Sequence, residues 1–478
     1  MFKRFFLLFL APVLGGCSTN AATGKQQFTA FMSPQQELRI GAEQHQNIIK
    51  EFGLYEDEAL QHYLNTVGKK VAQHTERQDL SYKFYLLDAP DVNAFALPGG
   101  YVYMTRGIMA LANSEAEFAS VLGHEVGHVT GRHGAERYSR SVVTGLSANI
   151  LSVAIGDAGV SNAIGLGANL YLTSYSRGQE TEADSLGIRY ISRTGYAPIA
   201  AQSFFKNMQA NQQLELKKDK KKSSGIPNYL STHPAVQNRV AQTGAEAARY
   251  SQEGVFNRER YLRAIDGMTF GDSADKGFVK DRDFYHPKIG FTFRAPQGFK
   301  IVNQPTKVIM QGEQSGILFD IAGNEKGHSA HHFLSQVWLA KQQYTGFEKV
   351  VVNGLPAATA VVYLRKSGKD LALRFFAIEW SPKQIVRFVI EMPRQVERGH
   401  ALALRDSVYS FRRLSQRERQ TLKPYKLRII NSTSRDTVAS LSKRMAVEQL
   451  KEEHFRVLNG LTANDKVVAG RLYKIVVE

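Results

Sequence analysis

Apolar residues recur at helical spacing through much of the first half of the chain. Ser33 followed by Pro34 predicts the start of one helix, and a second is expected over Asp57–Gln73. The apolar positions that follow Ser114 predict another helix, with Ser114 as its N-cap and Glu117 placed for a capping box. Further helices are expected at 176–194, 198–210 and 231–250. The first half is therefore predicted to be mainly helical.

Two stretches of this half have the alternation of strands. Residues 80–87 predict one strand, and residues 91–104 predict two strands joined by a Pro98-Gly99-Gly100 turn. The helix that begins after Ser114 follows this hairpin almost directly.

Beyond about residue 255 the pattern changes. Short β-rich runs between Tyr285 and Phe411 alternate with two predicted helices at 331–343 and 395–408, whereas residues 426–478 predict strand, helix, helix, strand. The expected fold class is α+β and multidomain. It combines a mainly helical domain carrying a small β-hairpin or sheet, an α+β middle domain and a small βααβ C-terminal domain.

The N-terminus has the pattern of a bacterial secretory signal: a charged start, an apolar run too short to span a bilayer, and then Leu14-Gly15-Gly16-Cys17. This motif resembles the lipobox of bacterial lipoproteins. The resemblance implies that Cys17 is lipidated and begins the mature chain, and Ser18 after it implies sorting to the outer membrane of a Gram-negative bacterium, on its periplasmic side. The alternative is a plain signal peptide with an incidental cysteine. Cys17 is the single cysteine, so no disulfide is expected.

A chain of 478 residues is long enough for two to four domains. The predicted division is a signal peptide (1–16), a tether (17–34), a mainly helical domain (35–255), an α+β accessory domain (281–413) and a βααβ module (425–478).

The net charge of +17 favours anionic neighbours such as lipid headgroups, acidic wall polymers or acidic protein faces. Nucleic acid is not expected, because the sequence has no zinc knuckle, RNP-type aromatic pattern or basic helix. The lysine run at 217–222 is interpreted as a solvated loop. Residues 142–172, rich in small and apolar types, predict core or lid helices, with shallow insertion into a membrane surface as the alternative.

His124-Glu125-Val126-Gly127-His128 carries the chemistry. Residues four apart share a helix face, so His124 and His128 can bind one metal ion, and Glu125 can reach a water on that metal. A catalytic zinc takes three protein ligands and keeps one position for water. Glu180 and Glu182 are both candidates for the third ligand.

The motifs together resemble peptidase family M48, which includes the CAAX prenyl proteases and the BepA-like periplasmic proteases. The resemblance covers about residues 35–250 and rests on His124–His128, on Ser176-Arg177-x-x-Glu180-x-Glu182-Ala183-Asp184-x-x-Gly187, and on Asn93-Ala94-Phe95-Ala96-x-Pro98-Gly99-Gly100. In that family the glutamate of an E-x-x-x-D motif is the third zinc ligand. Carried over, this implies one Zn²⁺ held by His124, His128 and Glu180, with Asp184 orienting a ligand histidine. The resemblance also implies that the domain at 35–255 is a metallopeptidase domain of the zincin (gluzincin) type.

The same resemblance implies an endopeptidase in which Glu125 accepts a proton from the activated water and delivers it to the leaving amine. The strand Asn93-Ala94-Phe95-Ala96 either pairs with an extended, unfolded substrate by β-augmentation or is simply structural. His233, in a Ser-Thr-His-Pro segment similar to that of BepA-like members, is expected to cap the zinc or to assist at the oxyanion. The alternative for His233 is a helix cap. Arg239 either binds the substrate chain or braces Glu180.

Two features concern partners. BepA-like proteins carry a TPR domain after the protease, and this sequence has none, so their partners are not carried over. Residues 436–441, 458–461 and 470–475 resemble a LysM module, which implies either binding to peptidoglycan or the same fold without a glycan site. The leading hypothesis is a lipid-anchored periplasmic zinc endopeptidase that acts on misfolded or misassembled envelope proteins. The rivals are an envelope scaffold with a largely silent protease and, more weakly, a peptidoglycan hydrolase.

Overall fold

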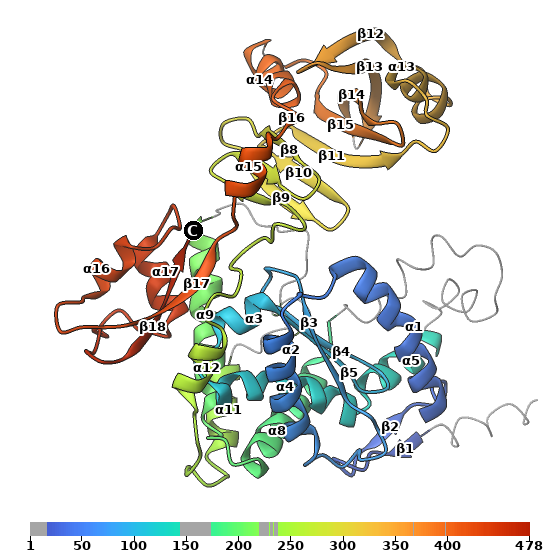
Figure 1. Cartoon of the computed structure of the whole chain (residues 1–478). Helices are drawn as coiled ribbons and strands as arrows, with labels where there is room; N and C mark the ends of the chain where they lie inside the picture. Colours follow the sequence, from blue (N-terminus) through green and yellow to red (C-terminus); the bar gives the residue numbers. More distant parts are fainter. Residues whose placement is uncertain are drawn as a thin grey trace, which may run out of the picture. The chain divides into compact units, whose positions relative to one another are not determined.

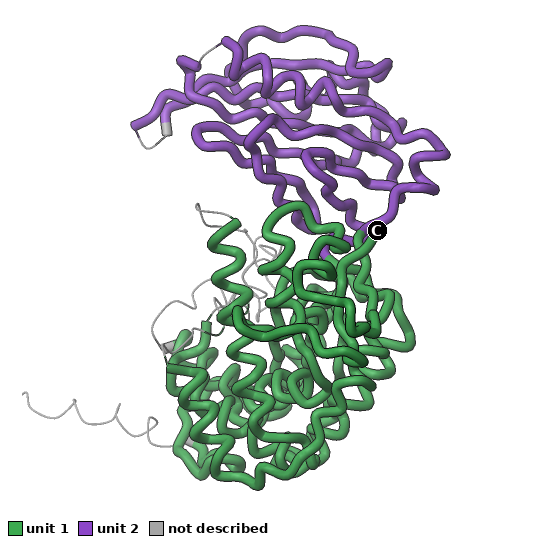
Figure 2. The backbone as a smooth tube through the Cα atoms, turned by 90° about the vertical axis from the view of Figure 1, so that its left-hand side faces the viewer, with its two compact units in different colours: residues 1–222, 227–270, 425–477 green, residues 223–226, 271–424, 478 purple. Residues whose placement is uncertain are grey.

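The computed structural model describes residues 17–143, 174–218, 229, 233, 238–366, 368–396 and 398–478. The chain splits into two compact units, shown in Figure 2. Unit 1 comprises Met1–Lys222, Pro227–Phe270 and Tyr425–Val477; unit 2 comprises Ser223–Ile226, Gly271–Pro424 and Glu478. The predictions for the signal peptide, for nearly all of 142–172 and for most of 219–237 lie outside the described residues. A mixed α and β architecture in more than one unit confirms the coarse fold class.

Unit 1 is rich in helices, labelled in Figure 1. Their bounds are α1 Pro34–Phe52, α2 Glu58–Ala72, α3 Arg106–Leu111, α4 Glu115–Thr130, α5 His133–Val143, α8 Arg177–Arg193, α9 Ala200–Lys218, α11 Arg239–Ala247 and α12 Arg258–Ala264. Ser33 and Ser114 cap α1 and α4 as predicted. The predicted capping box at α4 is incomplete, because the Glu117 carboxylate accepts from the backbone N–H of Asn113 at 2.7 Å. The lysine run is partly helical, since α9 extends to Lys218.

The sheet beside these helices has the order β3-β5-β4, with β3 Lys83–Leu87, β4 Ala94–Leu97 and β5 Tyr101–Thr105. β3 runs parallel to β5, and β4 forms the predicted hairpin with β5. Gly99 and Gly100 make the turn at φ values of +80° and +88°, a region that favours glycine. β4 therefore lies at an edge of this sheet.

The prediction of a free tether after Cys17 is wrong for residues 17–28, which form a hairpin bonded to the rest of unit 1. β1 Cys17–Thr19 and β2 Gln26–Phe28 form an antiparallel hairpin. The Asn20 amide donates to the backbone carbonyl of Thr130 at 2.9 Å, and the Gln27 amide donates to that of Gly131. Helix ends leave carbonyl groups without partners, and here polar side chains supply the donors. The polar residues that suggested a solvated tether instead donate hydrogen bonds to the last carbonyl groups of α4.

The C-terminal segment has its elements in the predicted order. They are β17 Lys426–Asn431, α16 Val438–Lys443, α17 Lys451–Leu458 and β18 Leu472–Val477. This segment lies in unit 1, where Leu441, Phe455 and Tyr473 belong to the same hydrophobic core as Leu122 of α4. A LysM-type glycan site there stays a prediction.

Unit 2 is built on a seven-stranded antiparallel sheet of order β12-β13-β14-β15-β11-β10-β9 and a smaller sheet of order β16-β8-β7-β6. The strand bounds are β6 Phe278–Lys280, β7 Asp283–His286, β8 Phe291–Arg294, β9 Lys300–Gln304, β10 Lys307–Gln311, β11 Gly316–Gly323, β12 Thr345–Val352, β13 Leu355–Lys366, β14 Lys369–Ser381, β15 Gln384–Pro393 and β16 Arg412–Arg413. The helices are α13 Ala330–His332, the π-helix η2 Phe333–Trp338, α14 Arg398–Tyr409 and α15 Gln416–Thr421. The helix predicted at 331–343 is thus shorter than expected. Across the described residues, no helix combines the length and apolar character needed to cross a membrane.

Candidate metal centre

The site begins with unusually close packing between α4 and α8. A side chain at Gly187 of α8 would place its Cβ 2.7 Å from the backbone nitrogen of His124. A Cβ at Gly127 of α4 would lie 2.9 Å from the carbonyl oxygen of Ala183. Because both positions are glycine, the two backbones approach closely. This contact brings the carboxylates of α8 to the histidines of α4.

Four buried side chains converge there: His124, His128, Glu180 and His233. His124 Nε2 lies 3.0 Å from His128 Nε2 and 3.2 Å from His233 Nδ1. Glu180 Oε1 lies 3.4 Å from His128 Nε2 and 3.0 Å from His233 Nδ1. Ligands about 2.0–2.1 Å from a tetrahedral zinc lie roughly 3.3–3.4 Å apart. The spacing of the four ligand atoms therefore fits one zinc ion, and Glu182 is not in the group.

Glu125 supplies a second test of that fit. Its side chain is 0% exposed, and neither carboxylate oxygen has a hydrogen-bond partner among the described residues. A buried polar group without a partner is costly, so the position is one that a bound water would satisfy. Burial raises the pKa of Glu125 above its usual range. A carboxyl group with a raised pKa takes up a proton more readily than an exposed one, as a general base does during a reaction.

Asp184 and Arg239 hold the first histidine and Glu180. Asp184 Oδ1 lies 2.8 Å from His124 Nδ1, so the proton on that nitrogen points away from the ligand group. Arg239 contacts Asp184 Oδ1 at 2.7 Å and Glu180 Oε2 at 2.9 Å. Burial alone would raise the pKa of Asp184, but Arg239 and His124 lower it below its usual range. Of the two roles open for Arg239, the structure places it where it braces Glu180.

His233 is held from the side opposite α4. Its ring stacks on that of Tyr229 with centroids 4.3 Å apart, and its backbone N–H donates to the Tyr229 carbonyl at 2.8 Å. The Tyr229 N–H donates in turn to the carbonyl of Val92, just before β4. The N-cap of α11 is Asn238, so His233 does not cap that helix.

Two neighbours of His128 were missed by the sequence reasoning. His133 Nδ1 lies 2.9 Å from His128 Nδ1, and the ring of Tyr175 stacks on His128 with centroids 3.8 Å apart. His133 begins α5, after α4 has ended, so helical periodicity gave no sign that it would meet His128. Tyr175 stands directly before the capping Ser176 of α8, and its proximity to that motif was the available signal.

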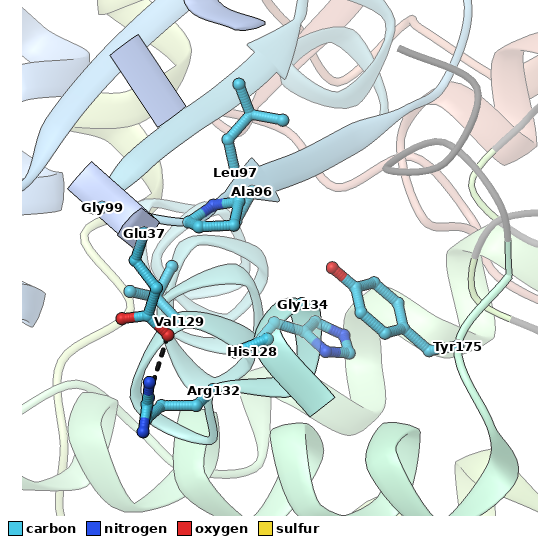
Figure 3. A pocket seen from close by; sticks show the side chains of 11 residues that line it. Glu37, Ala96, Leu97, Gly99, His128, Val129, Arg132, Gly134 and Tyr175 are labelled. Carbon is cyan, nitrogen blue, oxygen red and sulfur yellow. Dashed lines mark hydrogen bonds and ion pairs between the residues drawn. The ribbon is translucent and has the colours of Figure 1, made fainter. Parts of the chain in front are cut away.

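The predicted substrate strand lies beside this group. Asn93 precedes β4, which contains Ala94, Phe95 and Ala96 and pairs within the described strands with β5 alone. Figure 3 shows a pocket lined by Ala96 and Leu97 of this strand together with His128 and Tyr175. The Tyr175 hydroxyl points into that pocket. The edge strand β4 and His128 thus line the same pocket, and substrate binding by this strand stays a prediction.

The helix pair, the edge strand and the four-residue group define a metallopeptidase of the HExxH type with a glutamate on a second helix. Residues 58–247 match the family model of Peptidase family M48, so this segment is similar to an M48 peptidase domain. Zinc is the cofactor of this class, and the four buried ligands fit it.

Three curated relatives are also named as proteases. The beta-barrel assembly-enhancing protease of Yersinia pestis is 29% identical over 54% of this chain and 55% of its own length. The protein of that name in Escherichia coli (strain K12) is 30% identical over 44% of this chain and 43% of its own. The mitochondrial metalloendopeptidase OMA1 of Schizosaccharomyces pombe is 28% identical over 50% of this chain and 71% of its own. The chain thus spans about half the length of the first of these relatives.

Similarity to solved structures is much weaker. A protein from Bacteroides thetaiotaomicron covers 31% of this chain and 53% of its own with 8% identity and a TM-score of 0.24. At that level the likeness carries no argument about fold or function.

Proposed function

We propose that this chain is a zinc-dependent endopeptidase of the bacterial periplasm, anchored to the outer membrane through a lipid on Cys17, that acts on misfolded or misassembled envelope proteins. The observation that carries the proposal is the convergence of His124, His128 and Glu180 beside the unpartnered carboxylate of Glu125. The M48 match and the relatives named beta-barrel assembly-enhancing proteases support an envelope role.

The protein groups have distinct tasks in this mechanism. A bound zinc would lower the pKa of a water molecule and polarise the scissile carbonyl. Glu125 takes the proton of the attacking water on a carboxylate oxygen and passes it to the nitrogen of the leaving amine. Asp184 keeps His124 in the tautomer that presents Nε2. β4 aligns an extended substrate by backbone hydrogen bonds, which selects unfolded over folded chains.

His233 makes the resting site self-inhibited in this proposal. Its Nδ1 is 3.2 Å from His124 Nε2, and its Nε2 is 3.6 Å from Glu125 Oε1. The imidazole thus stands where the attacking water and the substrate carbonyl need room. Release of the segment that carries His233 would open the site.

Casein cleavage by His233→Ala tests the inhibition. We expect a higher basal rate than in the wild type, with His62→Ala, an exposed position, as the matched control. An unchanged or lower rate in His233→Ala would count against an inhibitory histidine.

The main rival is a scaffold or assembly factor whose protease is largely silent, tethered to the cell wall. The same position of His233 favours it, because a closed site has little basal activity. A Glu125→Gln variant discriminates the two. Failure to complement a deletion strain supports proteolysis as the main role, whereas full complementation supports the scaffold. Release of muropeptides from purified sacculi would instead indicate the peptidoglycan hydrolase.

A further inference from the structure

The two histidines of α4 are held by the same kind of contact on their far sides. His124 and His128 both present Nε2 to the ligand group. The remaining nitrogen of His124 faces Asp184 at 2.8 Å, and that of His128 faces His133 Nδ1 at 2.9 Å. A ligand histidine in a metal site almost always uses its second nitrogen in this way, because the contact fixes both the tautomer and the ring orientation.

Metal binding by His128 decides which nitrogen carries the proton in its contact with His133. If His128 Nε2 is to donate a lone pair, its proton must sit on Nδ1, and His133 Nδ1 must accept it. His133 then carries its own proton on Nε2, which points towards Glu182 Oε1 at 3.7 Å. His133 is 1% exposed, so water does not compete effectively for these positions.

Glu182 is fixed in turn by the N-terminal hairpin. Its second oxygen, Oε2, lies 2.5 Å from the ammonium group of Lys25, which stands immediately before β2. Helix α8 therefore supplies Glu180 to the ligand group, Glu182 to the Nε2 side of His133 and Asp184 to the outer nitrogen of His124.

From these contacts we infer that His133 and Glu182 are positioning residues of the metal site, with His133 accepting the Nδ1 proton of His128 and Glu182 orienting His133. The inference rests on the proposed metal function and extends it to two residues outside the ligand set. It also gives the segment after Cys17 a role at the site, because Lys25 holds Glu182.

Zinc affinity, measured by competition with a chromophoric chelator, tests this inference without any assay of proteolysis. We expect His133→Ala to bind zinc about 10- to 100-fold more weakly than the wild type, the usual effect of removing an outer partner of a ligand. His133→Asn should recover most of the affinity, because its amide oxygen can accept the same proton. Glu182→Gln, which keeps an oxygen but loses the charge, should show a smaller loss.

Removal of a buried histidine elsewhere provides the matched control. His286→Ala in unit 2, 8% exposed in the wild type, should leave zinc affinity unchanged. Wild-type affinity in His133→Ala would overturn the inference, as would an Asn variant as weak as the Ala variant, since that result indicates a packing defect. If His133→Ala does not fold, zinc affinity is compared in His133→Asn and Glu182→Gln. Near wild-type affinity in the first and a smaller loss in the second support the inference, and strong loss in the Asn variant overturns it. A wild type that binds no stoichiometric zinc would instead overturn the proposed metal function itself.

Discussion

Lys474, near the end of the chain, donates from its ammonium group to the backbone carbonyl of Ala110 at 2.7 Å. A second contact of 2.7 Å reaches the carbonyl of Ala112, and the lysine side chain is fully buried. These carbonyls lie at the end of α3, directly before α4, where a helix leaves acceptors without partners. The C-terminal segment thus completes the scaffold that carries the HExxH helix.

The first prediction compares two deletions, one of residues 271–424 and one of residues 425–478. Phe270 and Tyr425 are joined by a backbone hydrogen bond of 2.8 Å, and both belong to unit 1. Replacing residues 271–424 by a short glycine-serine linker should therefore leave unit 1 folded. Circular dichroism and zinc binding would measure this.

The matched comparison is removal of residues 425–478. That deletion would expose core side chains such as Leu441 and Phe455 and leave the Ala110 and Ala112 carbonyls without their donor. We expect an unfolded or insoluble protein. A soluble, zinc-binding product would show that the C-terminal segment is dispensable.

The second prediction is a pH dependence. Burial raises the pKa of Glu117 to about 7 from an ordinary value of 4.5. The folded state then binds the proton more tightly than the unfolded state, so the associated stability is present below about pH 4.5 and is lost as the pH rises through about 7. The stability of the wild type relative to Glu117→Gln should fall between these values, by at most about 1.4 kcal/mol per pH unit.

Urea unfolding of both proteins across this range measures the difference. Glu253→Gln, at an exposed position, controls for the loss of one carboxylate. A difference between wild type and Glu117→Gln that does not change with pH would contradict the prediction.

The third prediction concerns Arg239, whose guanidinium group lies between Glu180 and Asp184. Arg239→Met leaves two buried carboxylates without their cation, so we expect a loss of about 3–5 kcal/mol in the free energy of unfolding. Arg249→Ala removes an exposed ion pair with Glu246 and should cost about 0–1 kcal/mol. Equal effects in the two variants would show that the buried arginine has no special role.

The fourth prediction is that zinc stabilises the fold. A ligand that binds only the folded state adds about 2.7 kcal/mol when its free concentration is 100 times Kd. Chelation should therefore lower the Tm of the wild type, and added zinc should restore it. His124→Ala should show no such response, and a zinc-dependent Tm in that variant would indicate binding elsewhere.

Local sequence signals predicted much of unit 1 well. The caps Ser33 and Ser114 each precede the helix expected after them. These succeed because a cap satisfies backbone donors within three residues, so its cause is local. The Pro98-Gly99-Gly100 turn was predicted for the same reason, since its backbone conformation depends on residue type.

Contacts between distant segments were not predictable in this way. The polar hairpin after Cys17 was expected to be a tether, because composition does not show that Asn20 will meet a helix end more than a hundred residues later. Strands β6 and β7 of unit 2 begin before Tyr285, where the β-rich region was predicted to start, because pairing between strands rather than local pattern stabilises short strands.

By itself, the sequence determined the helix that carries His124, Glu125 and His128, because the spacing of these residues on a helix is a local property. It also supplied Glu180 as a candidate ligand through family resemblance. Only the tertiary structure decided that Glu180 and His233 reach the same point and that Arg239 and His133 lie beside the ligand group. It also decided that Lys474 contacts the end of α3, just before the helix of the motif. These depend on the close approach of α4 and α8 and on burial, which arise when the whole chain packs and not from any one segment.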